Sequence, residues 1–408
     1  MNRSELFEQF RNLQTPFYYY DMELLQQTID ELNLHIDPTW MKIHYALKAN
    51  VNKPILEMIR SNGFGADCVS GNEILLAIEN GFSPQNIVFA GVGKTDIDIQ
   101  LALNYDIACF NCESLQEVQV IDQIAASMGK IARIAIRLNP NVDAQTHEHI
   151  TTGIEQNKFG LSHEEFLKLL ELRDEMRFIR ITGLHFHIGS QITDFTVFER
   201  LCRRVNNIKS WVETYHFPLE HINLGGGLGI DYDNPDRNPI PDFRRYIKTL
   251  RDSLEMSEDQ QLHLEPGRSL VGQCGSLISR VLYIKNGGTK RFAVLDAGFT
   301  ELLRPALYQS THKIENLSSD KNALTYDIVG PICESTDRFG TGILLPETER
   351  GDLMLIRSAG AYGEVMSSYY NMRNKARSYY SSSIGSSTMI EECASQIGDI
   401  LNEINQHL

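Results

Sequence analysis

The chain has 408 residues, of which 42% are hydrophobic and 22% charged, a composition that is typical of globular proteins and excludes a disordered or collagen-like chain. This length predicts two or three domains. The formal net charge of -15, from 53 acidic and 38 basic side chains, opposes binding to nucleic acid or to an anionic membrane, and no basic run offsets it.

The N-terminal residues and the cysteines both indicate a cytoplasmic protein. Residues 1–21 carry charged and polar side chains where a signal peptide needs an apolar stretch, and no apolar run reaches the roughly 18 residues of a membrane span. The seven cysteines are odd in number and scattered, unlike the disulfide framework of a small secreted domain. Cys109 and Cys112 form a CxxC pair, but Cys109 lies in an apolar run, which favours core packing over redox chemistry.

Eight short apolar runs follow one another from residue 44 onward, with longer segments of helical periodicity between several of them. The runs are residues 44–49, 66–70, 87–90, 107–110, 134–138, 181–188, 221–224 and 262–265. This alternation is typical of a parallel sheet covered by helices. Eight units in about 230 residues match the size of a (β/α)8 TIM barrel, and the alternative is an open doubly wound sheet.

Catalytic groups of such a barrel lie where its strands end, so the residues that close the runs are candidates for the site. These residues are Lys48, Asp67, Arg137, His187, the glycines that follow Leu224, and Glu265. Lys48 lies in an otherwise apolar run, where burying a lone ammonium is costly unless its charge is removed or paired. Two explanations stay open: the amine is converted to a Schiff base, or it reaches a carboxylate such as Asp67.

Glycines occupy two segments that could bind phosphate. Gly225, Gly226 and Gly227 directly follow the seventh run, in the region where barrels often bind phosphate through backbone N–H groups, although a tight turn would explain them equally well. The segment GVGKT at residues 91–95 has Val88 in place of the first glycine of a P-loop, which argues against an ATPase.

Two histidines, His185 and His187, alternate along the sixth run, which predicts that they point to the same side of one strand. A metal site needs a third ligand, and none lies at a recognisable spacing. We therefore expect a pair of histidines in the barrel interior without a metal.

The sequence pattern changes near residue 270, where β-rich runs follow one another without long helices between them. We expect residues 29–270 to form the barrel and residues 271–375 to form a C-terminal all-β domain. Residues 1–28 are expected to pack with that β domain. The tail, residues 376–408, is polar and then helical in pattern from residue 389, and the sequence assigns it no role.

Seven sequence blocks in fixed order resemble the fold-type III pyridoxal-phosphate-dependent decarboxylases, and among them most closely the diaminopimelate decarboxylases. The blocks are YALKAN (45–50), HFHIGSQI (185–192), LGGGLGI (224–230), LEPGR (264–268), LRPALY (303–308), CEST (333–336) and GAYG (360–363). The resemblance implies a TIM barrel followed by a β domain, pyridoxal 5'-phosphate as cofactor, and a small amino acid as substrate.

The resemblance also assigns residues to the cofactor. Lys48 would hold it covalently, His187 would stack on its ring, and Ser190 would reach its phosphate. Glu265 would keep the ring nitrogen protonated, which makes the cofactor a strong electron sink. The other cofactor contacts that the resemblance implies are Gly225, Gly226, Gly227, Gly267, Arg268 and Tyr362.

For the substrate, the resemblance implies decarboxylation of meso-2,6-diaminopimelate to L-lysine, the last step of lysine biosynthesis. Cys333 would return a proton to the Cα atom, and the partner chain of a homodimer would contribute it together with Glu334. The distal end of the substrate would be bound by Arg268, Arg304, Tyr308, Glu334 and Tyr362. Arginine forks match a carboxylate, and a glutamate can pair with an ammonium.

Two departures from the family pattern and two other activities stand beside this interpretation. Thr336 stands where the family usually has Gly or Ser, and the segment 370–376 lacks a proline that the family has there. An amino-acid racemase of the same fold would have an arginine in place of Glu265. A polyamine-pathway decarboxylase, whose substrate has no distal carboxylate, would not need Arg304.

Overall fold

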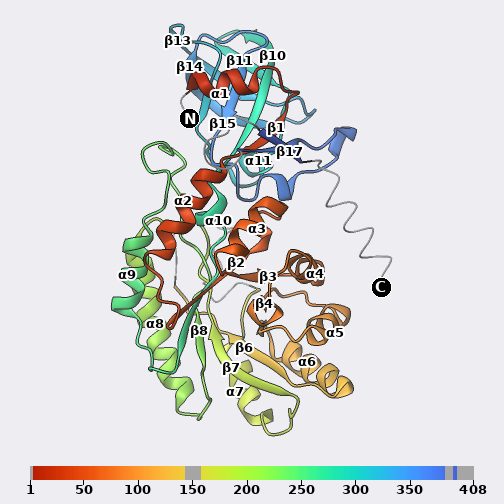
Figure 1. Ribbon diagram of the computed structural model, residues 1–408, viewed down its shortest axis with the longest axis vertical. Coiled ribbons are helices and arrows are strands. Elements are labelled where there is room, and N and C mark those ends of the chain that lie inside the picture. Colours follow the sequence, from red (N-terminus) through yellow and green to blue (C-terminus); the bar gives the residue numbers. More distant parts are fainter. Residues whose placement is uncertain (1–2, 143–157, 382–388, 393–408) are drawn as a thin grey trace. The chain divides into compact units, whose positions relative to one another are not determined.

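The computed structural model describes residues 3–142, 158–381 and, for the backbone alone, 389–392 (Figure 1). The chain divides into two compact units. The first unit contains residues 1–28, 230–240 and 270–408, and the second contains residues 29–229 and 241–269. Three separate stretches of the sequence therefore build the first unit, and two build the second.

The second unit is a closed barrel of eight parallel strands, which confirms the predicted TIM barrel and excludes the open doubly wound sheet (Figure 1). The strands are β2 (Met41–Ala46), β3 (Gly65–Cys68), β4 (Ile87–Phe89), β5 (Cys109–Cys112), β6 (Ala132–Arg137), β7 (Ile179–His185), β8 (His221–Asn223) and β9 (Gln261–Leu264). The last strand pairs with the first, with Leu262 opposite Met41 and Leu264 opposite Ile43. This pairing closes the barrel.

Helices alternate with the barrel strands. They are α3 (Lys53–Ser61), α4 (Gly71–Glu79), α5 (Asp96–Asn104), α6 (Leu115–Met128), α7 (His163–Leu172), α8 (Phe195–Glu213) and α9 (Phe243–Ser253). Six of them begin after a side-chain cap, because a side-chain oxygen of the capping residue accepts a backbone N–H of the first turn. The capping residues are Ser70, Thr95, Ser114, Ser162, Asp194 and Asp242. Among the helices of the described residues, none is both long and apolar enough to cross a membrane.

Seven of the eight barrel strands end before their apolar runs do, and β2 and β7 differ most, by three residues each. β2 ends at Ala46, so Lys48 lies on the short 3-10 helix η1 (Leu47–Ala49) and not on the strand. β7 ends at His185, so the expectation that His185 and His187 alternate along one strand is wrong. Buried residues continue past both strand ends, and apolar character therefore could not mark where strand pairing stops.

The first unit is built on a mostly antiparallel sheet, which agrees with the predicted β domain. The strand order is β14-β13-β11-β10-β1-β16-β17, and β15 pairs with both β10 and β12. The strands are β1 (Phe17–Tyr20), β10 (Gly275–Gly287), β11 (Lys290–Leu295), β12 (Ile314–Asn316), β13 (Ala323–Val329), β14 (Arg338–Pro346), β15 (Leu353–Ile356), β16 (Arg377–Ser381) and β17 (Met389–Glu392). The helical pattern expected from residue 389 is wrong for its first four residues, because β17 pairs antiparallel with β16. The rest of that segment lies outside the described residues.

The N-terminal strand and helix pack into the core of this first unit. β1 pairs antiparallel with β10 and parallel with β16. Phe10, at the end of α1 (Arg3–Phe10), packs edge-on against Phe17 and Tyr19, with ring centroids 5.4 and 4.9 Å apart. Phe17 in turn contacts Tyr379 of β16 at 5.1 Å. Aromatic side chains from both ends of the described chain therefore share one cluster.

Three buried histidines form a cluster on barrel strands β2, β8 and β9. His44 Nε2 lies 3.3 Å from His263 Nδ1, and the rings of His221 and His263 stack at 4.4 Å. Burial lowers the pKa of His221 to about 3 and also lowers the pKa of His44 and of His263. The three imidazoles are therefore neutral in the folded protein at neutral pH.

This cluster predicts that acid destabilises the barrel. The unfolded chain takes up a proton at each of these histidines below its ordinary pKa of 6.5, whereas the folded barrel keeps them neutral, so stability is lost as the pH falls below 6.5. Each histidine contributes a slope of about 1.4 kcal/mol per pH unit once the pH is well below that value.

The measurement is urea unfolding at several pH values between about 7 and 5. Both tryptophans of the chain, Trp40 and Trp211, lie in the barrel unit, so their fluorescence reports on that unit. His221→Asn should give a shallower pH slope than the wild type. The same substitution at the exposed His216 is the matched control, and equal slopes for wild type and His221→Asn would contradict this prediction.

Candidate active site

Lys48 and Asp67 form an ion pair at the carboxyl ends of two neighbouring barrel strands. Lys48 Nζ donates a hydrogen bond to Asp67 Oδ2 over 3.2 Å. The side chain of the lysine is 42% exposed, whereas that of Asp67 is fully buried. Of the two explanations that the sequence left open, the structure shows the pairing with a carboxylate, and it leaves the amine accessible to a small molecule.

Glu265, directly after β9, is a buried carboxylate held by three polar side chains. Asn111 Nδ2 and Asn223 Nδ2 both donate to its Oε1 atom, over 3.1 and 2.7 Å, and His185 Nε2 lies 3.3 Å from its Oε2 atom. Burial alone would raise the pKa of Glu265, but His185 and the charge of Lys48 outweigh burial and hold that pKa well below its usual range. The carboxylate is therefore ionised at neutral pH.

Asp67 is a second buried acid with the opposite behaviour. Burial raises the pKa of Asp67 to about 7, and the charge of Glu265 adds to that rise although Lys48 opposes it. The two acids therefore differ in protonation near neutral pH. Asp67 can hold or release a proton there, whereas Glu265 stays charged.

His187 and the three glycines are packed against one another. The backbone N–H of Gly226 donates to His187 Nδ1 over 3.4 Å, and a Cβ atom on Gly226 would lie 2.4 Å from the carbonyl oxygen of Glu265. Gly225 and Gly227 have positive φ angles of 68° and 114°. A tight turn is therefore present, and phosphate binding by it stays a proposal. Burial, together with Arg137 and Lys48, lowers the pKa of His187 well below its usual value, so its ring is neutral.

Ser190, Arg268 and Arg137 are also held by specific contacts in the barrel unit. Arg268 donates from Nε and Nη2 to Ser190 Oγ, over 3.3 and 3.1 Å. Arg137, the last residue of β6, donates to Glu113 Oε1 over 2.6 Å. The second oxygen of Glu113 accepts the backbone N–H of Gly160 over 2.9 Å. Both guanidinium groups are therefore oriented by side chains that follow barrel strands.

Asn111 and Asn223, which bind Glu265, were not among the residues predicted from the sequence. Asn223 is the last residue of β8, and Asn111 lies in β5 one residue beyond the apolar run predicted there. Both follow the same rule that selected Lys48, since they stand where a barrel strand ends. Applying this strand-end rule to amide side chains as well as to charged ones would have identified both asparagines.

The predicted substrate residues of the first unit form two groups. In one, the buried guanidinium group of Arg304 stacks on the rings of Tyr308 and Tyr362, at 5.2 and 5.6 Å. In the other, Cys333 is exposed, and Glu334 accepts a hydrogen bond from the hydroxyl of Tyr370 over 2.8 Å. The predicted residues Arg304, Tyr308 and Tyr362 are thus brought together within one unit.

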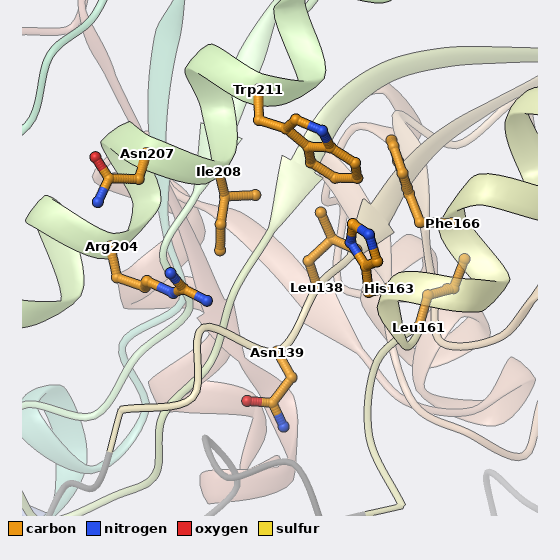
Figure 2. A pocket seen from close by; sticks show the side chains of 9 residues that line it. All are labelled: Leu138, Asn139, Leu161, His163, Phe166, Arg204, Asn207, Ile208 and Trp211. Carbon is orange, nitrogen blue, oxygen red and sulfur yellow. The ribbon is translucent and has the colours of Figure 1, made fainter.

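A separate pocket of about 270 Å³ lies between α7, α8 and the end of β6 (Figure 2). Its walls combine the apolar side chains of Leu138 and Ile208 with the indole of Trp211, and Arg204 and Asn207 lie at its polar end. None of the predicted site residues is among those that line it. The chain between two of its walls passes outside the described residues, so we assign the pocket no function.

Comparison with known proteins identifies the family. A family model described as the pyridoxal binding domain of pyridoxal-dependent decarboxylases matches residues 25–272. A diaminopimelate decarboxylase from Bacteroides thetaiotaomicron is 52% identical over 376 residues, which cover 92% of this chain and 97% of that protein. A diaminopimelate decarboxylase from Neisseria meningitidis serogroup B is 40% identical over 363 residues, which cover 89% of this chain and 86% of that protein.

A solved structure gives the same result. The crystal structure of diaminopimelate decarboxylase from Helicobacter pylori, complexed with L-lysine, has a TM-score of 0.87 with this chain at 36% identity and covers all of both chains. The family model covers more than half of the sequence, and the two relatives cover most of it. The chain therefore belongs to the pyridoxal-dependent decarboxylases, in the branch of the diaminopimelate decarboxylases.

Proposed function

We propose that this chain decarboxylates meso-2,6-diaminopimelate to L-lysine and carbon dioxide with pyridoxal 5'-phosphate, as the last step of lysine biosynthesis. The observation that carries the proposal is the ionised carboxylate of Glu265, which three side chains hold in the barrel interior. The direct test is a carbon dioxide assay on a panel of diaminopimelate, ornithine, arginine and lysine. Release from ornithine or arginine without release from diaminopimelate would overturn the substrate assignment.

The residues of the barrel fit this cofactor by their chemistry. Lys48 offers an accessible amine for covalent attachment, and His187 offers a neutral ring that can stack on a heteroaromatic ring. The turn at Gly225, Gly226 and Gly227 would bind the phosphate with Ser190, Gly267 and Arg268. Tyr362, which the family resemblance adds to this set, belongs to the first unit. When bound, the cofactor would supply an electron sink for the pair of electrons left by the departing carboxylate.

The chain's own acids and thiol would then control charge and protons. Glu265, ionised and hydrogen-bonded, would stabilise a positive charge on the ring nitrogen of the cofactor. Asp67, with its pKa near 7, can hold the proton that the neighbouring Lys48 amine must release before it acts as a nucleophile. The exposed thiol of Cys333 would return a proton to the substrate Cα.

The distal end of the substrate carries a carboxylate and an ammonium, so the site needs one group that binds an anion and one that binds a cation. Arg304, held between Tyr308 and Tyr362, presents a guanidinium group whose geometry matches a carboxylate. Arg268 would add a second cation, and Glu334 would pair with the distal ammonium. A substrate that lacks the distal carboxylate would offer Arg304 no such group to bind.

We further propose a homodimer in which Cys333 and Glu334 act in the partner's site. Tyr369, Tyr370 and Met372 are exposed large side chains close to one another in the sequence, and Met372 is 94% exposed. Tyr370 also binds Glu334, so this exposed group is continuous with a residue proposed to act on the substrate. Such clustering of apolar surface is typical of protein contact sites.

We also propose that the protein works in the cytoplasm. The six cysteines of the described residues are all free thiols, five of them buried. Reduced thiols are the ordinary state of cysteine in that compartment. The buried pair Cys109 and Cys112 has raised thiol pKa values because of burial, in agreement with the predicted core packing.

Replacing Glu265 tests the electrostatic role. Glu265→Gln removes the negative charge and keeps the size of the side chain, and we expect kcat to fall by roughly two orders of magnitude, or about 3 kcal/mol in the barrier. The KM for diaminopimelate should change little. Glu220→Gln is the control. Glu220 directly precedes β8, whereas Glu265 directly follows β9, and Glu220 pairs with Arg133 and Arg180. An unchanged kcat in Glu265→Gln would contradict the role.

Replacing Arg304 tests the substrate assignment. Arg304→Ala removes a charge-assisted contact worth about 1.5 to 3 kcal/mol, so the KM for diaminopimelate should rise by roughly ten- to 150-fold. Arg357→Ala, which removes a partly buried arginine of the same unit, is the control and should leave KM near the wild-type value. A wild-type KM in Arg304→Ala would remove this residue from the substrate site.

Mixing two inactive variants tests whether the site is shared between chains. Lys48→Ala and Cys333→Ala should each be nearly inactive, but a mixed dimer would contain one intact site. Random exchange of subunits should therefore restore about a quarter of the wild-type activity. Met372→Asp should weaken the dimer in sedimentation or size-exclusion measurements. No recovery on mixing, with exchange verified, would place Cys333 and Lys48 of one chain in the same site.

A further inference from the structure

Lys94 is a buried cation whose contacts have no part in the function proposed above. Its side chain is completely buried, and its Nζ atom donates to Gly91 O, Asn111 O and Glu117 Oε1, over 2.7, 2.9 and 2.6 Å. It belongs to the segment GVGKT, which the sequence analysis rejected as a P-loop. All three donor positions of the ammonium are therefore occupied by oxygen atoms of the barrel unit.

These contacts hold both ends of the segment that joins β5 to α6. Asn111 lies in β5, and Glu117 lies in the first turn of α6. The second oxygen of Glu117 accepts the backbone N–H of Glu113 over 2.8 Å. One ammonium therefore fixes residues 111–117 through a backbone carbonyl at one end and a carboxylate at the other.

Two side chains project from this segment to charged groups of the candidate site. The Asn111 amide donates to Glu265, and the Glu113 carboxylate binds Arg137. The same residue, Asn111, thus binds Lys94 through its backbone oxygen and Glu265 through its side chain. A shift of the Asn111 backbone would move its amide away from Glu265.

The energetics favour a role in positioning. Taking a lysine and a glutamate out of water costs several kcal/mol per ion, which their attraction offsets only when every donor is satisfied. An apolar pair of the same volume would often stabilise a core equally well or better. A polar anchor gives a defined geometry at the end of β5, which an apolar contact would not.

We propose that Lys94 is a positioning residue for the decarboxylation: it fixes the Asn111 backbone, so that the Asn111 amide stays on Glu265. The inference rests on the proposed function, because Glu265 is assigned there to the ring nitrogen of the cofactor. It adds to that function a residue that lies outside the site and acts through another side chain.

The test compares Lys94→Met with Asn111→Ala and with the double variant. Lys94→Met should lower kcat by about tenfold while KM stays within about twofold of the wild type. If Lys94 acts through Asn111, the double variant should be no slower than Asn111→Ala alone, because Asn111→Ala has already removed the amide that Lys94→Met would displace. Effects that multiply in the double variant, or a wild-type kcat in Lys94→Met, would overturn the proposal.

A matched control exists in the same unit. Lys130 also binds two backbone carbonyls, those of Leu103 and Asn104, and one carboxylate, that of Asp106, all in the segment that precedes β5. Lys130→Met should therefore leave kcat unchanged. If Lys94→Met does not fold, the comparison uses Lys94→Met with Glu117→Gln, which removes both buried charges and keeps an oxygen for the Glu113 N–H.

A second measurement does not depend on activity. Hydrogen exchange of the cofactor-free chain should become faster in residues 111–117 in Lys94→Met and stay unchanged there in Lys130→Met. Unchanged exchange in Lys94→Met would also overturn the proposal. A wild-type protein that releases no carbon dioxide from diaminopimelate would instead refute the proposed function, so the two failures are distinguishable.

Discussion

The charge of Glu265 inside the barrel is the constraint on which the rest of the site depends. A buried carboxylate without partners would take up a proton, because water no longer stabilises its charge. Here Asn111, His185 and Asn223 supply the missing interactions, and each comes from a different strand. Only a closed barrel brings the ends of β5, β7, β8 and β9 to one point, so the charge state of Glu265 depends on the fold as a whole.

The alternation of side chains along two strands separates neutral from charged groups within the barrel. His221 and Asn223 lie two residues apart on β8 and therefore face the same side of that strand. His221 stacks on His263 of β9, and Asn223 binds Glu265, which directly follows β9. The barrel interior thus carries a layer of neutral imidazoles and, one layer further along the strands, the ionised site. Layers of this kind are characteristic of TIM barrels.

Much of this arrangement could be predicted from the sequence, and the remainder depends on contacts that a linear pattern does not contain. The eight apolar runs located all barrel strands, and the strand-end rule selected Lys48, Asp67 and Glu265. The position of Lys48 off its strand was missed because the buried Leu47 continues the apolar run into a turn. The strand-end rule could have selected Asn111 as a candidate, but the partners of Asn111 and of Lys94 are distant in the sequence, so composition and spacing do not predict their contacts.

The tail is a second case in which the sequence pattern did not predict the structure. The spacing of apolar residues after residue 389 suggested a helix, yet Met389–Glu392 pair with β16. Strand formation at a sheet edge is decided by the neighbour that is available, and propensity is a weak guide there. The assignments of Cys333, Glu334 and Arg304 came from family resemblance alone and would not have followed from the residues themselves.

The place of β1 in its sheet has a consequence for biosynthesis. Its neighbours, β10 and β16, begin about 260 and 360 residues later in the chain. At translation rates of 5–20 residues per second, the four aromatic residues Phe17–Tyr20 leave the ribosome roughly 20 seconds to a minute before their last partner does. A nascent chain thus carries an unpaired aromatic strand for most of its synthesis. Such a segment is prone to aggregate unless a chaperone binds it.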